Sequence, residues 1–156
     1  MVLSKDAAIK KMQVMLQDEE SYSETVLLAT IKEQPECCRV TYENAGNGGD
    51  LVPLSAVLMY QPSLEVVQRI YEAHPSAISV SDERGDLPLN YACYCKAPLV
   101  IVQYLVERYP EALKMRNVDG LLPLHYAFYE QLCTLDTIQY LIEKYPEGLQ
   151  IGDEDG

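Results

Sequence analysis

The sequence lacks several features that would assign it to a common class of protein. It has no Trp and one Phe, and its 12 Lys and Arg residues are outnumbered by 24 Asp and Glu residues. A formal net charge of -12 argues against nucleic acid as a partner, because a phosphate backbone recruits basic side chains. No apolar run approaches the ~20 residues needed to cross a bilayer, so we also expect no membrane span.

The N-terminus also lacks the apolar core of a secretory signal, which is roughly 7–15 residues long. The cysteines are odd in number and scattered: Cys37, Cys38, Cys93, Cys95 and Cys133. Without a secretory signal, such cysteines are typical of reduced thiols rather than of a disulfide framework. We therefore expect a cytoplasmic protein.

The residues that are present describe one acidic globular domain. The chain has 156 residues, of which 48% are hydrophobic, and twelve of them are Tyr. This length suits a single domain of ordinary size, and this hydrophobic content is too high for a disordered acidic segment.

The clearest pattern in the chain is an internal repeat, which indicates a stacked architecture. The dipeptide Pro-Leu begins at Pro53, Pro88 and Pro123, with a spacing of 35 residues. Three related segments follow these dipeptides: LEVVQRIYEAHP, LVIVQYLVERYP and LDTIQYLIEKYP. A glycine stands ten residues after the final proline of each segment, at Gly85, Gly120 and Gly156.

Each unit is predicted to form a helix, a turn, a second helix and an extended turn. The first helix begins at the proline of Pro-Leu, because proline is favoured in a first helical turn. The second helix carries an apolar stripe, and it must end before the next proline, such as Pro110, because a residue before proline avoids the helical region. The stripe comprises Leu99, Val102, Leu105 and Val106 in one unit and Leu135, Ile138, Leu141 and Ile142 in the next. Gly120 suits a turn that needs a positive φ.

These landmarks resemble the ankyrin repeat family. The chain reads DERGDLPLNYA from Asp82 and NVDGLLPLHYA from Asn117, beside a family signature that contains Thr-Pro-Leu-His-x-Ala. It departs from that pattern at Leu87 and Leu122, where Thr is usual, and at Asn90, where His is usual. The resemblance implies an all-α, ankyrin-like solenoid of stacked helix-turn-helix repeats with extended β-turn links. It also implies that His125 forms hydrogen bonds with the backbone of a neighbouring turn.

From the repeat landmarks, we predict that residues 1–156 form a single ankyrin-repeat domain. We expect residues 5–17 to form a helix with Ala8, Met12, Met15 and Leu16 on one side, the first of a pair that caps the stack. The chain stops where another first helix would begin, so either the final helix pair is left partly exposed or the chain is part of a longer protein, and we expect the latter. The predicted units are the first helix of the N-terminal capping pair (1–22), a partial repeat (23–52) with a Gly-rich insertion (44–50), and three repeats (53–87, 88–122 and 123–156).

No group of residues has the spacing of a catalytic, cofactor or metal site. The Gly-rich NAGNGGD segment lacks the Lys of a phosphate-binding loop, and no Gly-x-Ser-x-Gly elbow is present. The Cys pairs lack the spacing of a zinc site, and the carboxylate clusters do not follow a calcium loop. Cys38 and Cys93 are expected in the core, as is Phe128, which aligns with Cys93, while Cys95 is expected at the surface. We therefore predict no catalytic residue, no cofactor and no metal.

The family resemblance places the binding surface on the concave face, which is formed by the turn tips and the first helices. Tyr and Met suit a contact surface there, since Tyr combines a large apolar area with a hydrogen-bonding tip. Carried over by position, the predicted partner-binding residues are Met59, Tyr60, Glu83, Arg84, Asp86, Tyr94, Cys95, Val118, Asp119, Leu121, Tyr129 and Glu130.

The leading functional hypothesis is a non-catalytic protein–protein interaction module, an ankyrin-repeat scaffold or adaptor within a larger protein. The acidic charge favours a partner with a basic surface. One alternative is a regulatory domain of a longer enzyme or signalling protein. A second is a structural unit that associates with itself through an uncapped C-terminal repeat.

Overall fold

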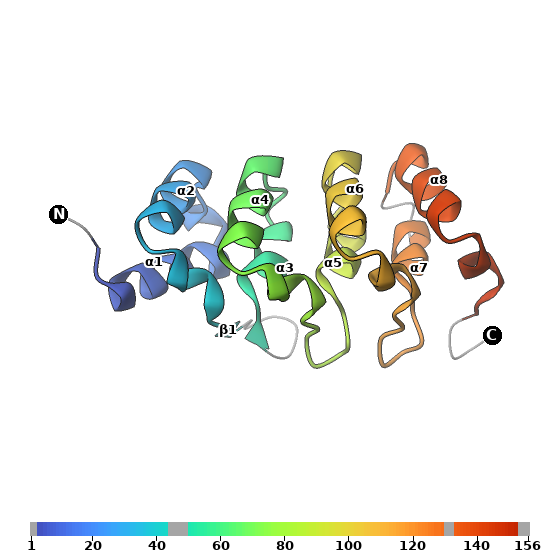
Figure 1. The fold of residues 1–156 in the computed structure, drawn as a ribbon, viewed down its shortest axis with the longest axis horizontal. Helices are drawn as coiled ribbons and strands as arrows, with labels where there is room; N and C mark the ends of the chain where they lie inside the picture. The colour runs from blue at the N-terminus through green and yellow to red at the C-terminus, as the bar shows by residue number, and fades with distance from the viewer. Residues whose placement is uncertain (1–2, 44–49, 130–132, 153–156) are drawn as a thin grey trace.

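Pairs of short antiparallel helices follow one another in a single row in the computed structural model (Figure 1), which describes residues 3–43, 50–129 and 133–152. The two helix layers pack neighbour against neighbour along the row, as α3 does on α5 and α4 on α6. This arrangement confirms the predicted all-α solenoid. The first helices are α1 (Lys5–Gln17), α3 (Pro53–Leu58), α5 (Pro88–Tyr94) and α7 (Pro123–Phe128), and the second helices are α2 (Glu24–Glu33), α4 (Leu64–Ala73), α6 (Leu99–Arg108) and α8 (Leu135–Lys144).

Local sequence explains where these helices start. Helices α3, α5 and α7 each open on the proline of Pro-Leu, as predicted. The side chains of Ser4 and Thr134 cap α1 and α8, because each accepts a hydrogen bond, both of 3.3 Å, from an amide three residues on. Among the described helices, none is both long and apolar enough to cross a membrane.

The N-terminal helix pair closes one end of the row. Helix α1 buries Ala8, Met12, Met15 and Leu16, which are the four residues that the sequence placed on one side. A short 3-10 helix, η1 (Glu19–Ser21), links α1 to α2. Helix α1 packs against α2 and α3, so its apolar side is covered by the first units of the stack.

Each second helix is followed by one non-helical residue and then by a proline, and that proline opens a 3-10 turn that the sequence did not predict. Tyr109, before Pro110, is extended, with φ -146° and ψ 76°, and His74 and Tyr145 have almost the same conformation. The 3-10 segments are η2 (Pro35–Arg39), η3 (Pro75–Ser79), η4 (Pro110–Lys114) and η6 (Pro146–Gln150). They return the chain from the second helix toward the next turn.

A two-stranded ladder at the Gly-rich insertion was also not predicted. Strand β1 (Tyr42–Glu43) pairs antiparallel with β2 (Asp50–Leu51), and Tyr42 lies opposite Leu51. The hydroxyl of Tyr42 donates a 2.7 Å hydrogen bond to the carbonyl of Cys37, which anchors the ladder to η2. The insertion itself lies outside the described residues, apart from Asp50.

Successive turn tips contact each other through their backbones. Gly85 and Gly120 have φ values of 81° and 75°, which confirms the positive φ predicted for Gly120. The amide of Val118 donates a 2.8 Å hydrogen bond to the carbonyl of Arg84, and this bond joins two turns of consecutive repeats. A Cβ added at Gly85 would lie 3.2 Å from the Cα of Asn117, so the turn tips approach too closely for a side chain there.

The last repeat leaves several apolar side chains exposed. The expected apolar stripe of α8 is wrong at Leu135, which is 76% exposed, although Leu141 is buried. Phe128 was expected in the core and is 49% exposed. Helix α6 covers one side of α8, and the described residues place no helix on its other side. The residues that a further unit would cover therefore meet solvent.

Candidate functional site

Two consecutive turns are shaped by side chains that hydrogen-bond to their own backbone. Asp82 Oδ1 accepts from the amides of Arg84 and Asp86, at 2.9 and 2.8 Å. Asn117 occupies the same place one repeat later, and its Oδ1 accepts from the amides of Asp119 and Leu121, at 3.0 and 2.9 Å. An Asp and an Asn thus accept the same backbone hydrogen bonds in the two turns, and only the Asp adds a charge.

Tyrosines of the first helices connect these turns to the helix layer. The hydroxyl of Tyr91 in α5 donates to Asp82 Oδ2 at 2.6 Å. The hydroxyl of Tyr126 in α7 donates to the carboxylate of Asp86 at 3.0 Å, and Asn117 Nδ2 donates to both that hydroxyl and Asp86. Asp86 therefore connects the turn before α5 to the turn before α7 and to α7 itself.

Burial sets the protonation of this network. It raises the pKa of Asp86, and the hydrogen bonds from Tyr126 and Asn117 oppose that rise. Burial also raises the pKa of Tyr91 and of Tyr126, and their carboxylate partners raise it further. The two phenols consequently stay protonated, and they donate to carboxylates at neutral pH.

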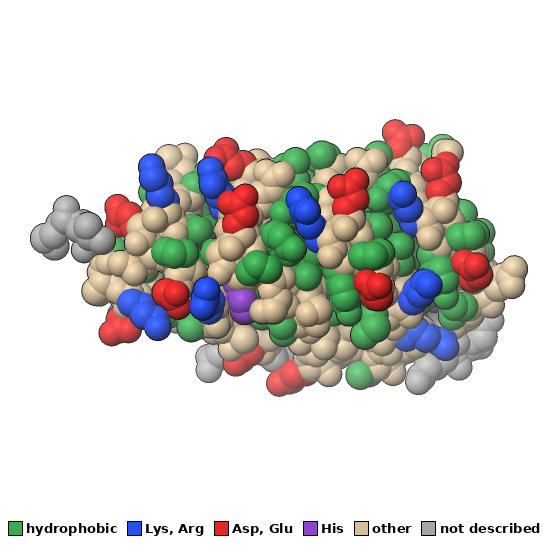
Figure 2. Space-filling model, viewed as in Figure 1, with side chains coloured by type: hydrophobic (Ala, Val, Ile, Leu, Met, Phe, Trp, Pro, Cys, Tyr) green, Lys and Arg blue, Asp and Glu red, His purple; other side chains and the backbone are tan. Residues whose placement is uncertain are grey.

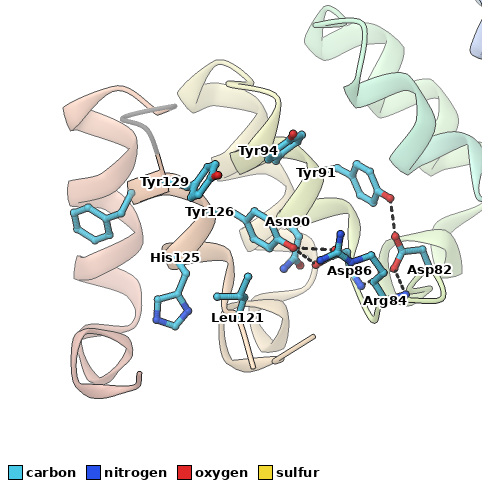
Figure 3. A pocket seen from close by; sticks show the side chains of 11 residues that line it. Asp82, Arg84, Asp86, Asn90, Tyr91, Tyr94, Leu121, His125, Tyr126 and Tyr129 are labelled. Atoms are coloured by element: carbon cyan, nitrogen blue, oxygen red, sulfur yellow. Dashed lines mark hydrogen bonds between the residues drawn. The ribbon is translucent and has the colours of Figure 1, made fainter. Parts of the chain in front are cut away.

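A hollow of about 560 Å³ lies over these residues, between the second and third repeats (Figure 3). The turn tips contribute Asp82, Arg84, Asp86 and Leu121 to its lining. Helix α5 contributes Asn90, Tyr91 and Tyr94, and the α7 segment contributes His125, Tyr126, Phe128 and Tyr129. Tyr94 and Tyr129 are 48% and 59% exposed, so much of the wall is aromatic surface that remains in contact with solvent.

The motif histidine holds its turn as the resemblance implied. His125 Nδ1 accepts from the amide of Leu122 at 2.8 Å, so Nε2 carries the hydrogen and donates to the carbonyl of Ile151 at 2.8 Å. Asn90 reproduces only the first bond, because its Oδ1 accepts from the amide of Leu87 at 3.1 Å. Its buried Nδ2 has no hydrogen-bond partner among the described residues.

The structure brings together five of the predicted partner-binding residues. Arg84, Asp86, Tyr94, Leu121 and Tyr129 all line the hollow. Asp86 needs a correction, because it is only 7% exposed and its carboxylate is occupied by Tyr126 and Asn117. It supports the wall and offers little surface to a partner.

The other predicted residues that the structure describes lie outside the hollow. Asp119 forms an ion pair with Arg84 at the rim, and Glu83 and Val118 are exposed at the turn tips. Met59 is exposed at the end of α3, and Glu130 lies outside the described residues.

Two predicted residues are less available than expected. The ring of Tyr60 stacks on that of Tyr22, with the ring centroids 4.8 Å apart, and the Tyr60 hydroxyl donates a hydrogen bond to the carbonyl of Leu16. Tyr60 therefore joins the end of α3 to the N-terminal helix pair. Cys95 is half-buried rather than exposed, and burial raises the pKa of its thiol to about 11. A protonated thiol of this kind is a poor nucleophile at neutral pH.

Sequence reasoning missed the remaining lining residues for identifiable reasons. Asp82, Tyr91 and Tyr126 recur in the repeat, but repetition indicates a structural role and does not reveal that two turns enclose a hollow. Phe128 was assigned to the core by alignment with Cys93, whose burial depends on the repeat that follows it. The number of Tyr residues was the one signal that pointed toward this surface.

The described part of the chain contains no cluster of His, Cys, Asp and Glu suited to a metal ion. All five cysteines are free thiols; Cys37, Cys38, Cys93 and Cys133 are buried. The burial of Cys38 and Cys93 confirms that part of the prediction. Over the face drawn in Figure 2, basic and acidic side chains are interspersed along the row of helices, without a large patch of one sign.

Comparison with known families identifies the repeat. A family model described as ankyrin repeats (3 copies) matches residues 54–155. The match covers the three predicted full repeats and includes every described residue of the hollow. Among curated proteins, none matches this chain in sequence.

Proposed function

Because the chain belongs to the ankyrin-repeat family, we propose that it is an adaptor or scaffold that binds another protein through the hollow between its second and third repeats. Ankyrin repeats are generally protein–protein interaction modules and are typically non-catalytic. The observation that carries the proposal is the exposure of Tyr94 and Tyr129 on the wall of this hollow. Exposed aromatic side chains of this kind are enriched where proteins meet.

The network beneath the wall favours binding by a preformed surface. Tyr126, Asn117 and Asp86 connect neighbouring turns, and Tyr94 packs edge to face on Tyr126, so this part of the aromatic wall is held in place before a partner arrives. A preorganised surface loses less conformational entropy on binding than a mobile one. The net charge of -12 supports a partner whose own surface is basic.

A capture experiment from the protein's own cell extract tests the proposal. The intact chain is compared with a Tyr94→Ser, Leu121→Ser, Tyr129→Ser variant, after melting curves show that both are equally folded. We expect a specific protein to be captured by the intact chain and lost from the variant. Capture of the same proteins by both chains would contradict binding at the hollow.

Self-association through the last repeat is a second candidate, favoured by a separate observation. Leu135 and Leu149 are 76% and 56% exposed on the final unit, and apolar surface of this kind associates in water. Sedimentation over a range of concentrations tests it. A mass that rises with concentration in the intact chain, and stays monomeric in a Leu135→Ser, Leu149→Ser variant, would support this candidate over an adaptor that acts as a monomer.

A further inference from the structure

The hollow combines negative charge with aromatic faces, and this combination restricts what it accepts. Two carboxylates line it, those of Asp82 and Asp86, against the single guanidinium of Arg84. That guanidinium already forms an ion pair with Asp119. His125 adds no charge in the tautomer that its two hydrogen bonds require. The electrostatic balance of the hollow is therefore negative.

The aromatic faces strengthen this preference for a positive group. Tyr94 meets Tyr126 edge to face, with ring centroids 6.0 Å apart and an interplanar angle of 83°. Figure 3 shows these two rings and Tyr129 along the same side of the hollow, with Asp86, Arg84 and Asp82 on the other side. The face of a phenol ring attracts cations. Because Tyr126 donates its hydroxyl hydrogen to a carboxylate, its ring becomes more electron-rich, which increases that attraction.

We infer that the hollow binds a cationic side chain, an arginine or a lysine, presented by an extended segment of the partner protein. The cation lies against Tyr94, Tyr126 and Tyr129, within the field of the carboxylates of Asp82 and Asp86. The hollow extends over two turns and two helices, so it has room for such a side chain and for part of the chain that carries it. This inference rests on the proposed function, because it names the chemistry by which the same surface selects its partner.

Both carboxylates act mainly through their field. Asp82 already accepts from the amides of Arg84 and Asp86 and from the hydroxyl of Tyr91. Asp86 is buried under Tyr126 and Asn117. The exposed rings therefore make the direct contact, and the fixed charges behind them select the sign of the ligand. Binding of this kind weakens as salt screens the exposed part of the interaction.

A peptide titration followed by NMR tests the inference on the full chain. The probes are four seven-residue peptides of Gly and Ser, capped at both ends, with Arg, Lys, citrulline or Glu at the centre. We expect the Arg and Lys peptides to shift the ring signals of Tyr94, Tyr126 and Tyr129, and the ratio of their affinities shows which cation is preferred. Citrulline has the shape of Arg without its charge, so its peptide should bind at least fivefold more weakly.

The chain offers a matched variant that removes one charge and keeps the turn. Asp82→Asn places at this turn the residue type that Asn117 already supplies in the next one, where it makes the same backbone hydrogen bonds. We expect Asp82→Asn to weaken the Arg peptide threefold or more. Asp6→Asn, an exposed residue in α1 at the opposite end of the row, removes the same charge and should leave the affinity unchanged.

Three results would overturn the inference: equal binding of the citrulline and Arg peptides, preference for the Glu peptide, or an equal effect of Asp82→Asn and Asp6→Asn. The capture experiment separates this failure from failure of the proposed function. If the captured protein is lost from the triple variant but is retained by Asp82→Asn in full, the hollow binds its partner without selecting a cation. If the triple variant retains it, the proposed function itself is wrong.

Discussion

The inner repeat at 88–122 and the last repeat at 123–152 have nearly the same sequence pattern and very different surfaces. Leu113 is 6% exposed, while Leu149, at the same place in the last repeat, is 56% exposed. Cys93 is fully buried and its counterpart Phe128 is half exposed. Leu113 and Leu149 are the same residue type, so the difference between them arises from the neighbour on the C-terminal side. In this protein the core belongs to the contact between repeats more than to any one repeat.

The two repeats also differ in the hydrogen bonds of a polar residue at the same position. Both ring nitrogens of His125 form hydrogen bonds. One of them donates to the carbonyl of Ile151, the residue that follows the 3-10 segment η6 of the same repeat. Asn90 stands at the same place, and its shorter side chain satisfies one bond and leaves Nδ2 buried without a partner among the described residues. At this position the inner repeat is therefore less well hydrogen-bonded than the last one, although the last repeat has a buried hydroxyl of its own, that of Tyr140, without a partner among the described residues.

The largest expected difference in unfolding free energy comes from substitutions at the centre of the inner repeat and on the surface of the last one. Leu105→Ala removes a fully buried side chain in α6 and should lower the free energy of unfolding by about 2–5 kcal/mol. Tyr129→Ser in the last repeat removes an exposed ring and should lower it by roughly 0.5 kcal/mol or less. Urea unfolding followed by circular dichroism measures both, and equal losses would contradict the assigned faces.

A matched pair of leucines sharpens the comparison. Leu113→Ala should lower the unfolding free energy by about 2–3 kcal/mol, because it leaves a cavity between repeats. Leu149→Ala makes the same chemical change on an open surface, and we expect a loss below roughly 1 kcal/mol. Thermal melts of the two variants suffice as the measurement. A cost for Leu149→Ala as large as that for Leu113→Ala would show that the last repeat is covered in solution.

Exchanging Asn90 and His125 should reverse the difference in hydrogen bonding between the two repeats. His125→Asn would leave the carbonyl of Ile151 without its donor and should destabilise by about 1–2 kcal/mol. Asn90→His should stabilise by roughly 1 kcal/mol if the longer side chain reaches the carbonyl of Met115, which corresponds to Ile151. Denaturant midpoints compare the two. Destabilisation by Asn90→His would show that the inner repeat cannot accommodate the imidazole.

The smallest expected effect is a pH dependence at the contact between the two repeats. Burial raises the pKa of Asp86 in the folded protein. Its contribution to stability is therefore fully present below the unfolded pKa of about 3.9 and is lost as the pH rises through the folded pKa. Asp86→Asn removes this titration while keeping an oxygen for Tyr126. Unfolding measured from about pH 4 to 7 should favour the variant increasingly as the pH rises, and a trend of opposite sign would contradict the assigned shift.

The repeat and the helices within it follow from the sequence alone, because the signals for them lie within a few residues of one another. Proline starts α3, α5 and α7, a non-helical residue before a proline follows each second helix, and Gly85 and Gly120 adopt the positive φ of the turns. The side of α1 that is buried was also predicted from its periodicity.

Which of these repeated residues form a surface depends on how the repeats pack against one another. The hollow exists because Tyr126 of α7 and Asn117 of the turn before α7 meet Asp86 of the turn before α5, across 40 and 31 residues of chain. Likewise, Leu113 is buried because the next repeat packs against it, and Leu149 is exposed because no described residues cover it in that way. A repeated sequence specifies the same local structure at every copy, whereas burial, charge balance and access to solvent depend on the neighbours of each copy, and those neighbours differ along the row.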